Sequence, residues 1–467
     1  MTFVRFVGEC VDDARYSEFV AQRARGVCDR FNDRANVTLE FHRGTKPISF
    51  RLSPDHQDFL DLTTLLYVAD QSTSRASADN YWTRDLSFIV PVANPTLWQG
   101  STEALLRTLT FLTGDRYDFA WPTRGRLPSE VEHRLSLPRD RFDVVCLFSG
   151  GLDSLIGAYW LLDQGKQVLL VGHKSDATAS KVQRELAGEL DRLFPGKSSL
   201  IQSLATNARR QDTTYPVLEK VEETHRVRSF LFLAVAICLA KATRVEEIVL
   251  PENGFIALNA PLQVSRLGPL STRTAHPIYL SRFLNFVQRA GLYGGSIRNP
   301  FLYQSKTDLV AGIPAALHPL ALASVSCAHP GRNAGYRNCG YCVACLYRRA
   351  SLVGLGIDEP GRYKHDVFTG LSTLTALKQQ DFRALVAFAE RAEQATPGER
   401  TRLVLAHGAF PSDVGGRIGP HAAADYSPWS DMLKRWAESF LSMVRRLSTR
   451  ETLKILGLRA SATRRAV

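Results

Sequence analysis

The chain has 467 residues, of which 45% are hydrophobic and 22% are charged. This length fits about three domains, or one enzyme domain with extensions, and the composition excludes a disordered, collagen-like or coiled-coil chain. Fifty-eight Lys and Arg against 46 Asp and Glu leave a net charge of +12.

We expect a cytoplasmic protein without membrane contact. The first residues carry charges before any apolar run forms, so they do not predict a secretory signal. Residues 229–240 are apolar but too few to span a bilayer, and residues 309–331 are interrupted by Pro and His. In the cytoplasm cysteines stay reduced, so a cluster of them indicates a metal or catalysis rather than disulfides.

Residues 1–135 favour a mixed α/β module. A helix is predicted near residues 16–31, and alternating apolar residues predict strands at 86–92 and 117–121. Turn residues at 94–95 and 114–115 punctuate these segments. We can read no chemistry here, and we interpret the region as a docking or lid module of unknown role.

From residue 142 the pattern changes to short apolar strands alternating with helices, which is typical of βαβ units around a parallel sheet. Strands are predicted at 144–148, 168–171 and 247–250, and helices at 154–162, 179–193 and 228–242. The fold class is therefore α/β with a doubly wound parallel sheet over residues 142–358.

A six-residue loop lies between the first of these strands and its helix: Ser149, Gly150, Gly151, Leu152, Asp153 and Ser154. Backbone N–H groups in such a turn, together with the helix N-terminus, bind phosphate oxygens. The hydroxyls add donors, and Asp153 could orient the loop or help to hold Mg²⁺. No Lys follows the glycines as in G-x-x-x-x-G-K-[ST], which disfavours simple γ-phosphate hydrolysis. A Gly-Gly turn alone also fits an ordinary strand-to-helix connection.

Four cysteines form a C-x11-C-x2-C-x2-C pattern: Cys327, Cys339, Cys342 and Cys345. Four thiolates complete a tetrahedral zinc site, and a closed site of this kind leaves no position for an activated water. We therefore predict a structural zinc knuckle. Chance clustering, a redox pair and an iron–sulfur cluster are the alternatives.

Residues 359–467 form a helical extension with a Pro- and Gly-containing linker and a basic tail. Nine basic and three acidic residues lie in residues 431–467, which carry half of the net charge. A basic tail of this kind can attract nucleic acid, an acidic membrane or an acidic partner. Its apolar residues Leu433, Trp436, Phe440, Val444 and Leu447 recur at helical spacing, which favours packing on the protein's own core over docking of a partner.

The string SGGLDS resembles the pyrophosphate-binding loop of the ATP pyrophosphatase (PP-loop) superfamily, with its adenine nucleotide alpha hydrolase-like fold. Together with the cysteine pattern, it resembles 7-cyano-7-deazaguanine synthase, the QueC family. Arg228 opens a segment similar to the family's R-N-x-x-F-L-S, with Ser229 in place of Asn. Residues 299–310 are similar to its late proline and K-x-x-[IL]-V segment, and Cys345 to Arg348 match its C-x-x-R ending.

The resemblance implies ATP-dependent adenylation of a 7-deazaguanine carboxylate with release of pyrophosphate, followed by capture of the activated acyl group by an amine. It covers residues 142–358, and the enlarged layout is most similar to the QatC type of QueC-like proteins from the Qat antiphage system. That similarity implies protein partners from a defence operon, and a protein amine as an alternative acceptor to ammonia.

Residue roles follow from the same resemblance. The six loop residues would hold the pyrophosphate part of ATP, with Asp153, Arg228 and Lys306 as catalytic residues. The segment after the strand ending at Leu250 lies where open α/β sheets place ligands, so Glu252, Asn253 and Asn259 are the candidate substrate-binding residues. A purely structural alternative is a surface salt bridge for Arg228 and for Lys306. For Glu252 and Asn253 the alternative is an ordinary turn.

Two other functions fit the sequence less completely. An RNA-modifying PP-loop ligase or thiolase would use the basic tail to hold nucleic acid. A non-catalytic scaffold of a defence complex would keep the fold without the reaction, but the intact loop together with Arg228 and Lys306 argues against it.

Overall fold

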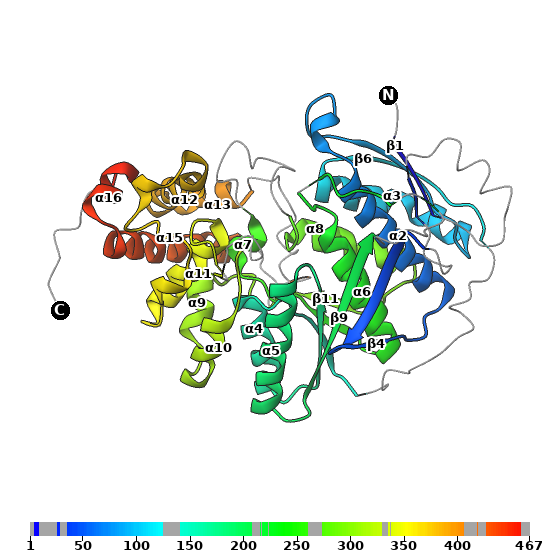
Figure 1. Ribbon diagram of the computed structural model, residues 1–467, viewed down its shortest axis with the longest axis horizontal. Coiled ribbons are helices and arrows are strands. Elements are labelled where there is room, and N and C mark those ends of the chain that lie inside the picture. The colour runs from blue at the N-terminus through cyan, green and yellow to red at the C-terminus, as the bar shows by residue number, and fades with distance from the viewer. Residues whose placement is uncertain are drawn as a thin grey trace.

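The computed structural model describes residues 4–8, 26–28, 35–124, 141–207, 215, 217–222, 224–259, 273–328, 335–336, 338–405, 418 and 426–458. They form two sheets with helices around them, and a separate group of helices towards the C-terminus (Figure 1). No helix within these ranges combines the length and apolar character needed to cross a membrane.

The larger sheet has seven strands in the order β11-β10-β7-β8-β9-β3-β4. Five of them run parallel: β7 (Val144–Leu147), β8 (Val168–His173), β9 (Ser198–Asn207), β10 (Glu247–Val249) and β11 (Ser296–Arg298). β7 lies between β8 and β10, so the strand order reverses on either side of it. The predicted α/β class with a mostly parallel sheet is confirmed.

Helices cover both faces of this sheet because its strands are apolar on both sides. Val144 and Cys146 of β7 belong to the core on the side of α4 (Leu152–Asp163) and α5 (Ala177–Leu193). Val145 belongs to the opposite core, which contains α6 (Arg228–Thr243) and α8 (Pro277–Arg289). The body of α6 is apolar nearly all round, since it packs between the sheet and a helix of the N-terminal region.

The smaller sheet is N-terminal, with four parallel strands in the order β2-β1-β5-β6. Its strands are β1 (Val4–Gly8), β2 (Gly26–Cys28), β5 (Asp85–Ile89) and β6 (Arg116–Ala120), and its helices are α2 (Pro54–Ser72) and α3 (Pro95–Thr113). The helix predicted near residues 16–31 is wrong at Gly26–Cys28, where pairing with β1 holds a strand; the segment 9–25 lies outside the described residues.

The N-terminal region also extends the larger sheet. β3 (Val37–Arg43) pairs antiparallel with β9, and β4 (Lys46–Ile48) pairs with β3. Helix α2 packs on α6, and α3 packs on α8. The N-terminal region and the larger sheet therefore share backbone pairing and one continuous core.

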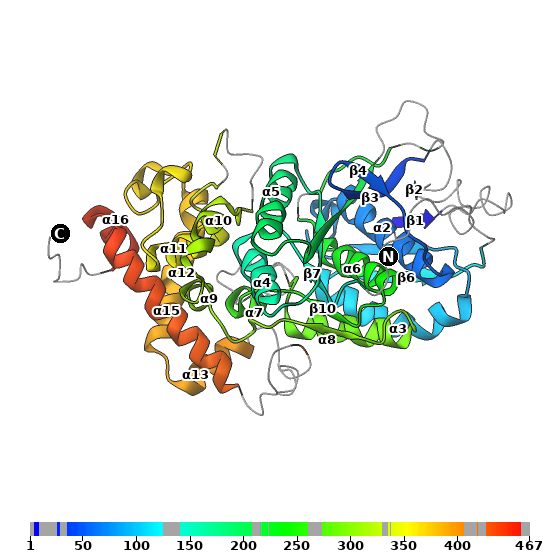
Figure 2. The same ribbon diagram turned by 90° about the horizontal axis from the view of Figure 1, so that it is seen from below.

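The C-terminal helices lie at the end of the molecule opposite to the N-terminal sheet in both views (Figures 1 and 2). They are α7 (Gly254–Leu258), α9 (Lys306–Ala311), α10 (His318–Ala323), α11 (Val343–Gly354), α12 (Ala376–Gln394), α13 (Pro397–Val404), α15 (Ser427–Leu447) and α16 (Arg450–Leu456). The predicted stripe of α15 packs into the protein's own core: Leu433, Trp436, Phe440 and Val444 are all buried.

Candidate functional site

The loop 149–154 follows the carboxyl end of β7, at the point where the strand order reverses. Gly150 has φ +78°, a left-handed conformation that favours glycine. The Ser149 Oγ accepts the Gly151 N–H at 3.2 Å and lies 3.2 Å from the Ser154 Oγ, which donates to the Gly151 carbonyl at 3.0 Å. Gly151 begins α4 without a side-chain cap. The loop thus holds itself in shape and presents a helix N-terminus suited to phosphate.

Asp153, Lys306 and Asn253 come together beside this loop from three different elements. The Asp153 Oδ1 lies 3.0 Å from the Lys306 Nζ, and its Oδ2 accepts the Asn253 Nδ2 at 2.7 Å. All three side chains are buried. Lys306 is the first residue of α9, between Ser305 and Asp308, which form the capping box of that helix. Asn253 caps α7 through its Oδ1. The surface salt bridge considered for Lys306 is therefore replaced by a buried ion pair.

Glu252 adds a second carboxyl group to this cluster. Burial alone would raise the pKa of Asp153, but Lys306 and hydrogen bonds from Glu252 and Asn253 lower the pKa of Asp153 below its usual range. Burial and the neighbouring Asp153 carboxylate raise the pKa of Glu252 well above its usual range. The pKa values of the two carboxyl groups are therefore shifted in opposite directions, and Asp153 is the more acidic of the pair. Since both oxygens of Asp153 contact protein groups, its predicted role in holding Mg²⁺ stays a prediction.

Arg228 lies at the start of α6 and is exposed. Its guanidinium carbon is 5.8 Å from the centre of the Phe232 ring. Burial and the charge of Arg228 lower the pKa of His173, at the end of β8, to about 3, so this imidazole is neutral. Among the described residues no contact joins Arg228 to Asp153 or Lys306. It lies at the carboxyl edge of the sheet near β8, to one side of the ion pair.

The sequence did not predict the polar residues that hold the loop 149–154 against β8 and β9. The Gln183 Nε2 of α5 donates to the carbonyls of Ser149 and His173, each at 3.2 Å, and its Oε1 accepts the Gln202 Nε2 at 2.8 Å. The His173 Nδ1 lies 2.9 Å from the Ser203 Oγ. His173 ends β8, Gln202 and Ser203 lie midway along β9 and Gln183 is on α5, so no local motif in the sequence marks them.

The four cysteine sulfurs fit a metal ion. Cys327, Cys339, Cys342 and Cys345 are buried, and their sulfurs lie within 4.8 Å of one another. The Cys339 and Cys345 sulfurs are 3.8 Å apart, which is about the spacing that tetrahedral Zn–S bonds of ~2.3 Å require. Gly340 has φ +88° where the chain turns between two ligands. The predicted zinc site therefore has a suitable donor set, and a closed site of this kind supplies structure rather than a bound water.

The cysteine cluster is joined to the phosphate loop through the chain before Cys327. The Val325 N–H donates to the Gly150 carbonyl at 3.0 Å, and the Leu152 N–H points to the Ser326 Oγ at 3.5 Å. Arg348, at the end of the C-x-x-R pattern, donates to the Ser324 Oγ at 2.6 Å and to two carbonyls of α10. The residues around the cluster therefore brace the loop, which the sequence motifs did not show.

Asn259 has a different position from the other predicted substrate residues. It is the C-cap of α7, in a left-handed conformation with φ 49°. Its N–H donates to carbonyls of Phe255 and Ile256, which ends the helix. The structure shows this capping role directly, and substrate binding by Asn259 stays a prediction.

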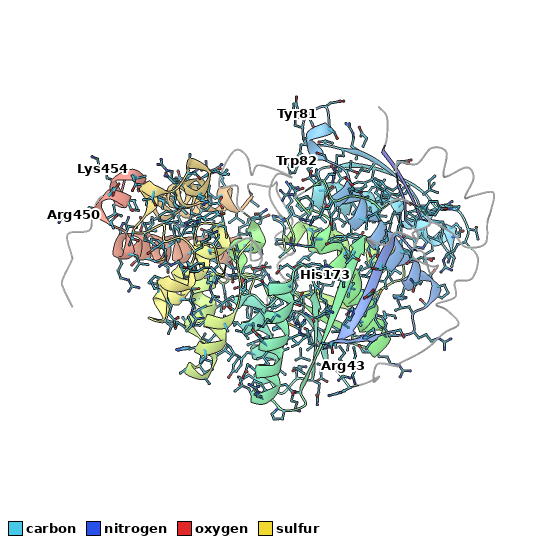
Figure 3. The ribbon with its side chains drawn as sticks, in the orientation of Figure 1. Arg43, Tyr81, Trp82, His173, Arg450 and Lys454 are labelled. Carbon is cyan, nitrogen blue, oxygen red and sulfur yellow. The ribbon has the colours of Figure 1, made fainter. Side chains whose placement is uncertain are left out.

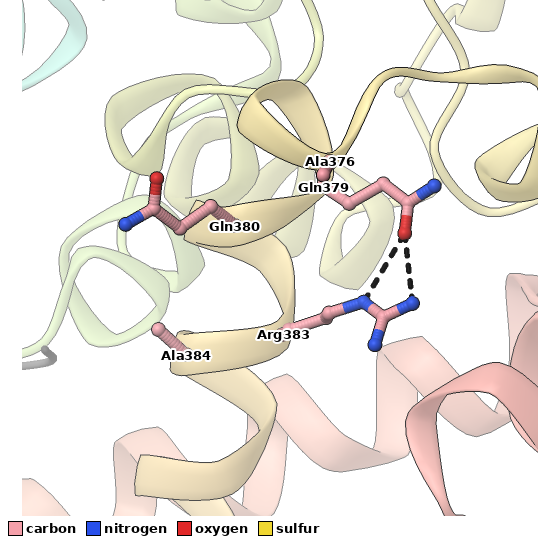
Figure 4. A pocket seen from close by; sticks show the side chains of 5 residues that line it. All are labelled: Ala376, Gln379, Gln380, Arg383 and Ala384. Carbon is pink, nitrogen blue, oxygen red and sulfur yellow. Dashed lines mark hydrogen bonds between the residues drawn. The ribbon is translucent and has the colours of Figure 1, made fainter.

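A hollow on the outer face of α12 lies apart from this site (Figure 4). It is lined by Ala376, Gln379, Gln380, Arg383 and Ala384. The Arg383 Nε and Nη2 donate to the Gln379 Oε1 at 3.1 and 2.8 Å, the bonds drawn in Figure 4. None of the predicted site residues lines this hollow, so we give it no part in the reaction.

Comparison with known proteins shows sequence similarity to a set of enzymes. The 7-cyano-7-deazaguanine synthase of Methanoculleus marisnigri is 29% identical over 238 residues, which are 47% of this chain and 98% of that enzyme. The synthases of Psychrobacter arcticus and Acinetobacter baylyi are each 25% identical, over 48% and 47% of this chain and 90% and 94% of theirs. No family model matches the chain. About half of the chain is similar in sequence to 7-cyano-7-deazaguanine synthases. The other half extends beyond these synthases.

Proposed function

We propose that this chain is an ATP-dependent ligase of the QueC type, which adenylates the carboxylate of a 7-deazaguanine and transfers the acyl group to an amine. The observation that carries the proposal is the phosphate loop at the carboxyl end of β7 with the buried Asp153–Lys306 pair beside it. The similarity of half of the chain to 7-cyano-7-deazaguanine synthases supports the choice of substrate class.

The chemistry accounts for the residues of the site. A carboxylate is a poor acyl donor because it would have to expel oxide, so a carboxylate oxygen attacks the α-phosphorus of ATP and pyrophosphate leaves. The loop N–H groups receive the charge that develops on the leaving pyrophosphate, and Lys306 and Arg228 neutralise negative charge on the phosphates or the acyl oxygen. An amine then attacks the acyl carbon, AMP leaves, and the amine loses a proton.

The amine defines the finer function. Ammonia would give an amide. The amide oxygen would then attack the α-phosphorus of a second ATP with release of pyrophosphate, and loss of AMP and of the two amide protons would give the nitrile. A protein amine would instead give a deazaguanine–protein conjugate. We favour an acceptor supplied by partners of a bacterial antiphage system, in the cytoplasm, because half of the chain extends beyond the synthases it resembles. Mg²⁺ would accompany the ATP phosphates.

RNA is the second candidate for the acceptor. Binding of RNA by the basic residues of α15 is disfavoured, because three of these residues contact other protein groups. Arg435 contacts Asp308, Arg445 lies 3.5 Å from Glu393, and Arg446 donates to the Val353 carbonyl. Exposed basic residues remain on α16, where Arg450 and Lys454 lie at one end of the molecule (Figure 3).

Incubation of the full chain with 7-carboxy-7-deazaguanine and ATP tests the proposal. We expect pyrophosphate and AMP in equal amounts, and loss of both in Asp153→Asn. Addition of ammonium, candidate partner proteins or RNA in separate reactions identifies the acceptor by mass spectrometry. A well-folded protein that releases no pyrophosphate with any of these acceptors would support the scaffold instead.

A further inference from the structure

A buried cluster of four charged residues lies in the N-terminal region. Asp70, Arg75, Arg84 and Asp115 are each at most 3% exposed. The Arg84 Nη2 contacts the Asp70 Oδ1 at 2.6 Å and the Asp115 Oδ2 at 2.7 Å, and Arg75 binds Asp115 through two bonds of 2.9 Å. The two arginines and the two aspartates balance in charge. Each arginine binds both carboxylate oxygens of Asp115, and this bidentate geometry fixes the positions of the side chains.

This cluster holds the segment that leads into α6. The Gln71 carbonyl accepts the N–H groups of Val221 and Glu222 at 2.9 Å, and the Glu222 Oε2 accepts the Arg75 N–H at 2.8 Å. The Arg75 Nε donates to the Thr224 Oγ1 at 3.2 Å. Val221, Glu222 and Thr224 are therefore tied by hydrogen bonds to the end of α2 and to Arg75, which follows it.

A further contact of the cluster reaches the first turn of α6. The Asp70 Oδ2 accepts the Val227 N–H at 3.0 Å. Val227 is the N-cap residue of α6 and has no side-chain oxygen to cap the helix. Asp70 binds the N–H of this N-cap residue from a different element, the contact that the carboxylate of a capping box makes, and its negative charge suits a helix N-terminus. The next residue along the chain is Arg228.

Two aromatic contacts join the same parts of the molecule. Tyr67, one turn before Asp70 on α2, lies edge-on to His173 with ring centres 5.9 Å apart. The Trp82 ring, labelled in Figure 3 on the N-terminal region, packs against the guanidinium groups of Arg75 and Arg226 at 4.4 and 5.3 Å. The first contact holds α2 against the end of β8, and the second holds Arg226, two residues before Arg228, beside Arg75.

We propose that Asp70 is a positioning residue that fixes Arg228 at the carboxyl edge of the sheet, by capping α6 through the Val227 N–H. The N-terminal region is then part of the catalytic edge rather than a separate docking or lid module. This inference rests on the proposed function, because it takes Arg228 to act on the reacting phosphates or acyl group.

The test compares two buried aspartates of the N-terminal region. Asp70→Asn removes the charge that caps α6. Asp58→Asn is the matched control, because Asp58 is 0% exposed and paired with Arg124 at 2.5 Å, but its partners are Ala93 and Arg124 rather than the segment before α6. Each change is made in the wild-type chain and with Arg228→Ala, and pyrophosphate release is measured with 7-carboxy-7-deazaguanine and ATP.

We expect Asp70→Asn to lower kcat/KM about tenfold in the wild-type chain and less than twofold when Arg228 is already Ala, since the two changes remove one effect. Asp58→Asn should change kcat/KM less than twofold in either background. Hydrogen exchange of residues 224–232 should become faster in Asp70→Asn and stay unchanged in Asp58→Asn. Glu222→Gln, which loosens the same segment without removing a member of the cluster, replaces Asp70→Asn if that variant does not fold.

An equal loss of rate with and without the Arg228 side chain, or unchanged exchange of residues 224–232, would overturn the proposal. A wild-type chain that releases no pyrophosphate would overturn the proposed function, and the exchange measurement would then decide by itself whether Asp70 orders the start of α6.

Discussion

Trp436→Ala tests whether the C-terminal helix α15 is part of the core. Trp436 is 3% exposed, and its ring stacks on Phe255 of α7 with ring centres 3.9 Å apart. The rings of Phe440, Tyr347 and Phe388 surround it at 5.5, 5.8 and 5.9 Å. Removal of the indole leaves a cavity between α7, α11, α12 and α15, because the neighbouring rings come from these four helices.

The expected cost follows from the buried area and the cavity. About 200 Å² of largely apolar side chain at ~25 cal/mol per Å² gives roughly 5 kcal/mol as an upper value. Measured losses for buried Trp or Phe changed to Ala are about 3–5 kcal/mol, so we expect a decrease of that size in the free energy of unfolding. The indole N–H makes no hydrogen bond among the described residues, so Trp436→Phe should cost less than about 2 kcal/mol.

Urea denaturation followed by circular dichroism measures the effect on the full chain. Leu377→Ala is the control, because Leu377 on α12 is 79% exposed and its loss should change the unfolding free energy by less than about 0.5 kcal/mol. Equal denaturation midpoints for Trp436→Ala and Leu377→Ala would refute the packing of α15, and would favour a helix that docks a partner.

Three further predictions concern the site. Asp153→Asn should reduce pyrophosphate release at least a hundredfold, while the zinc content stays at one per chain. We choose Asn because Ala would leave the buried Lys306 ammonium unpaired. Normal turnover of this variant would contradict the assignment of the loop to ATP. Cys342→Ser should lower the zinc content, the melting temperature and the rate together, because the cysteine cluster braces the loop through the chain before Cys327; a metal-free wild-type chain of equal stability would contradict this. The pKa of His173 is about 3 in the folded chain against an ordinary value of 6.5, so the unfolded chain binds the extra proton and stability falls as pH drops from 6.5 towards 3, by up to about 1.4 kcal/mol per pH unit. His173→Gln removes this dependence, and parallel pH curves of unfolding free energy for variant and wild type would show that His173 is not buried and neutral.

The sequence predicted those features whose residues are neighbours along the chain. The loop 149–154 is six consecutive residues, and three of the four cysteines lie within seven positions, so local spacing was enough to predict the turn and the cysteine cluster. Phosphate binding by the loop stays a prediction. Pairing between distant segments was not predictable in this way. Gly26–Cys28 forms a strand because β1 pairs with it, and β3 joins the larger sheet because it meets β9, more than 150 residues later. Neither partner can be read from local propensity.

The same limit applies to the site. Lys306 and Asp153 were each selected from a motif, yet their contact depends on α9 meeting α4 across the edge of the sheet. The residues that support the site carry no motif at all. Asp70, Gln183 and Val325 act through backbone groups or a single amide, and their sequence neighbours are ordinary helix and loop residues. Their roles appear only when the elements are assembled.

Three separate parts of the molecule support the carboxyl edge, and each does so at a different site residue. The chain before Cys327 binds the Gly150 carbonyl. The N-terminal region binds Val227, which precedes Arg228. Trp436 of α15 stacks on α7, and the N-cap residue of α7, Asn253, binds Asp153. Because the supports act on different residues, their effects should differ in kind. Damage to the cysteine cluster should weaken binding of the ATP phosphates. Loosening of α15 should alter the charge and position of Asp153, whereas Asp70→Asn should alter only the contribution of Arg228. A double variant from two of these parts should therefore show multiplied losses of rate, while two changes within one part should not.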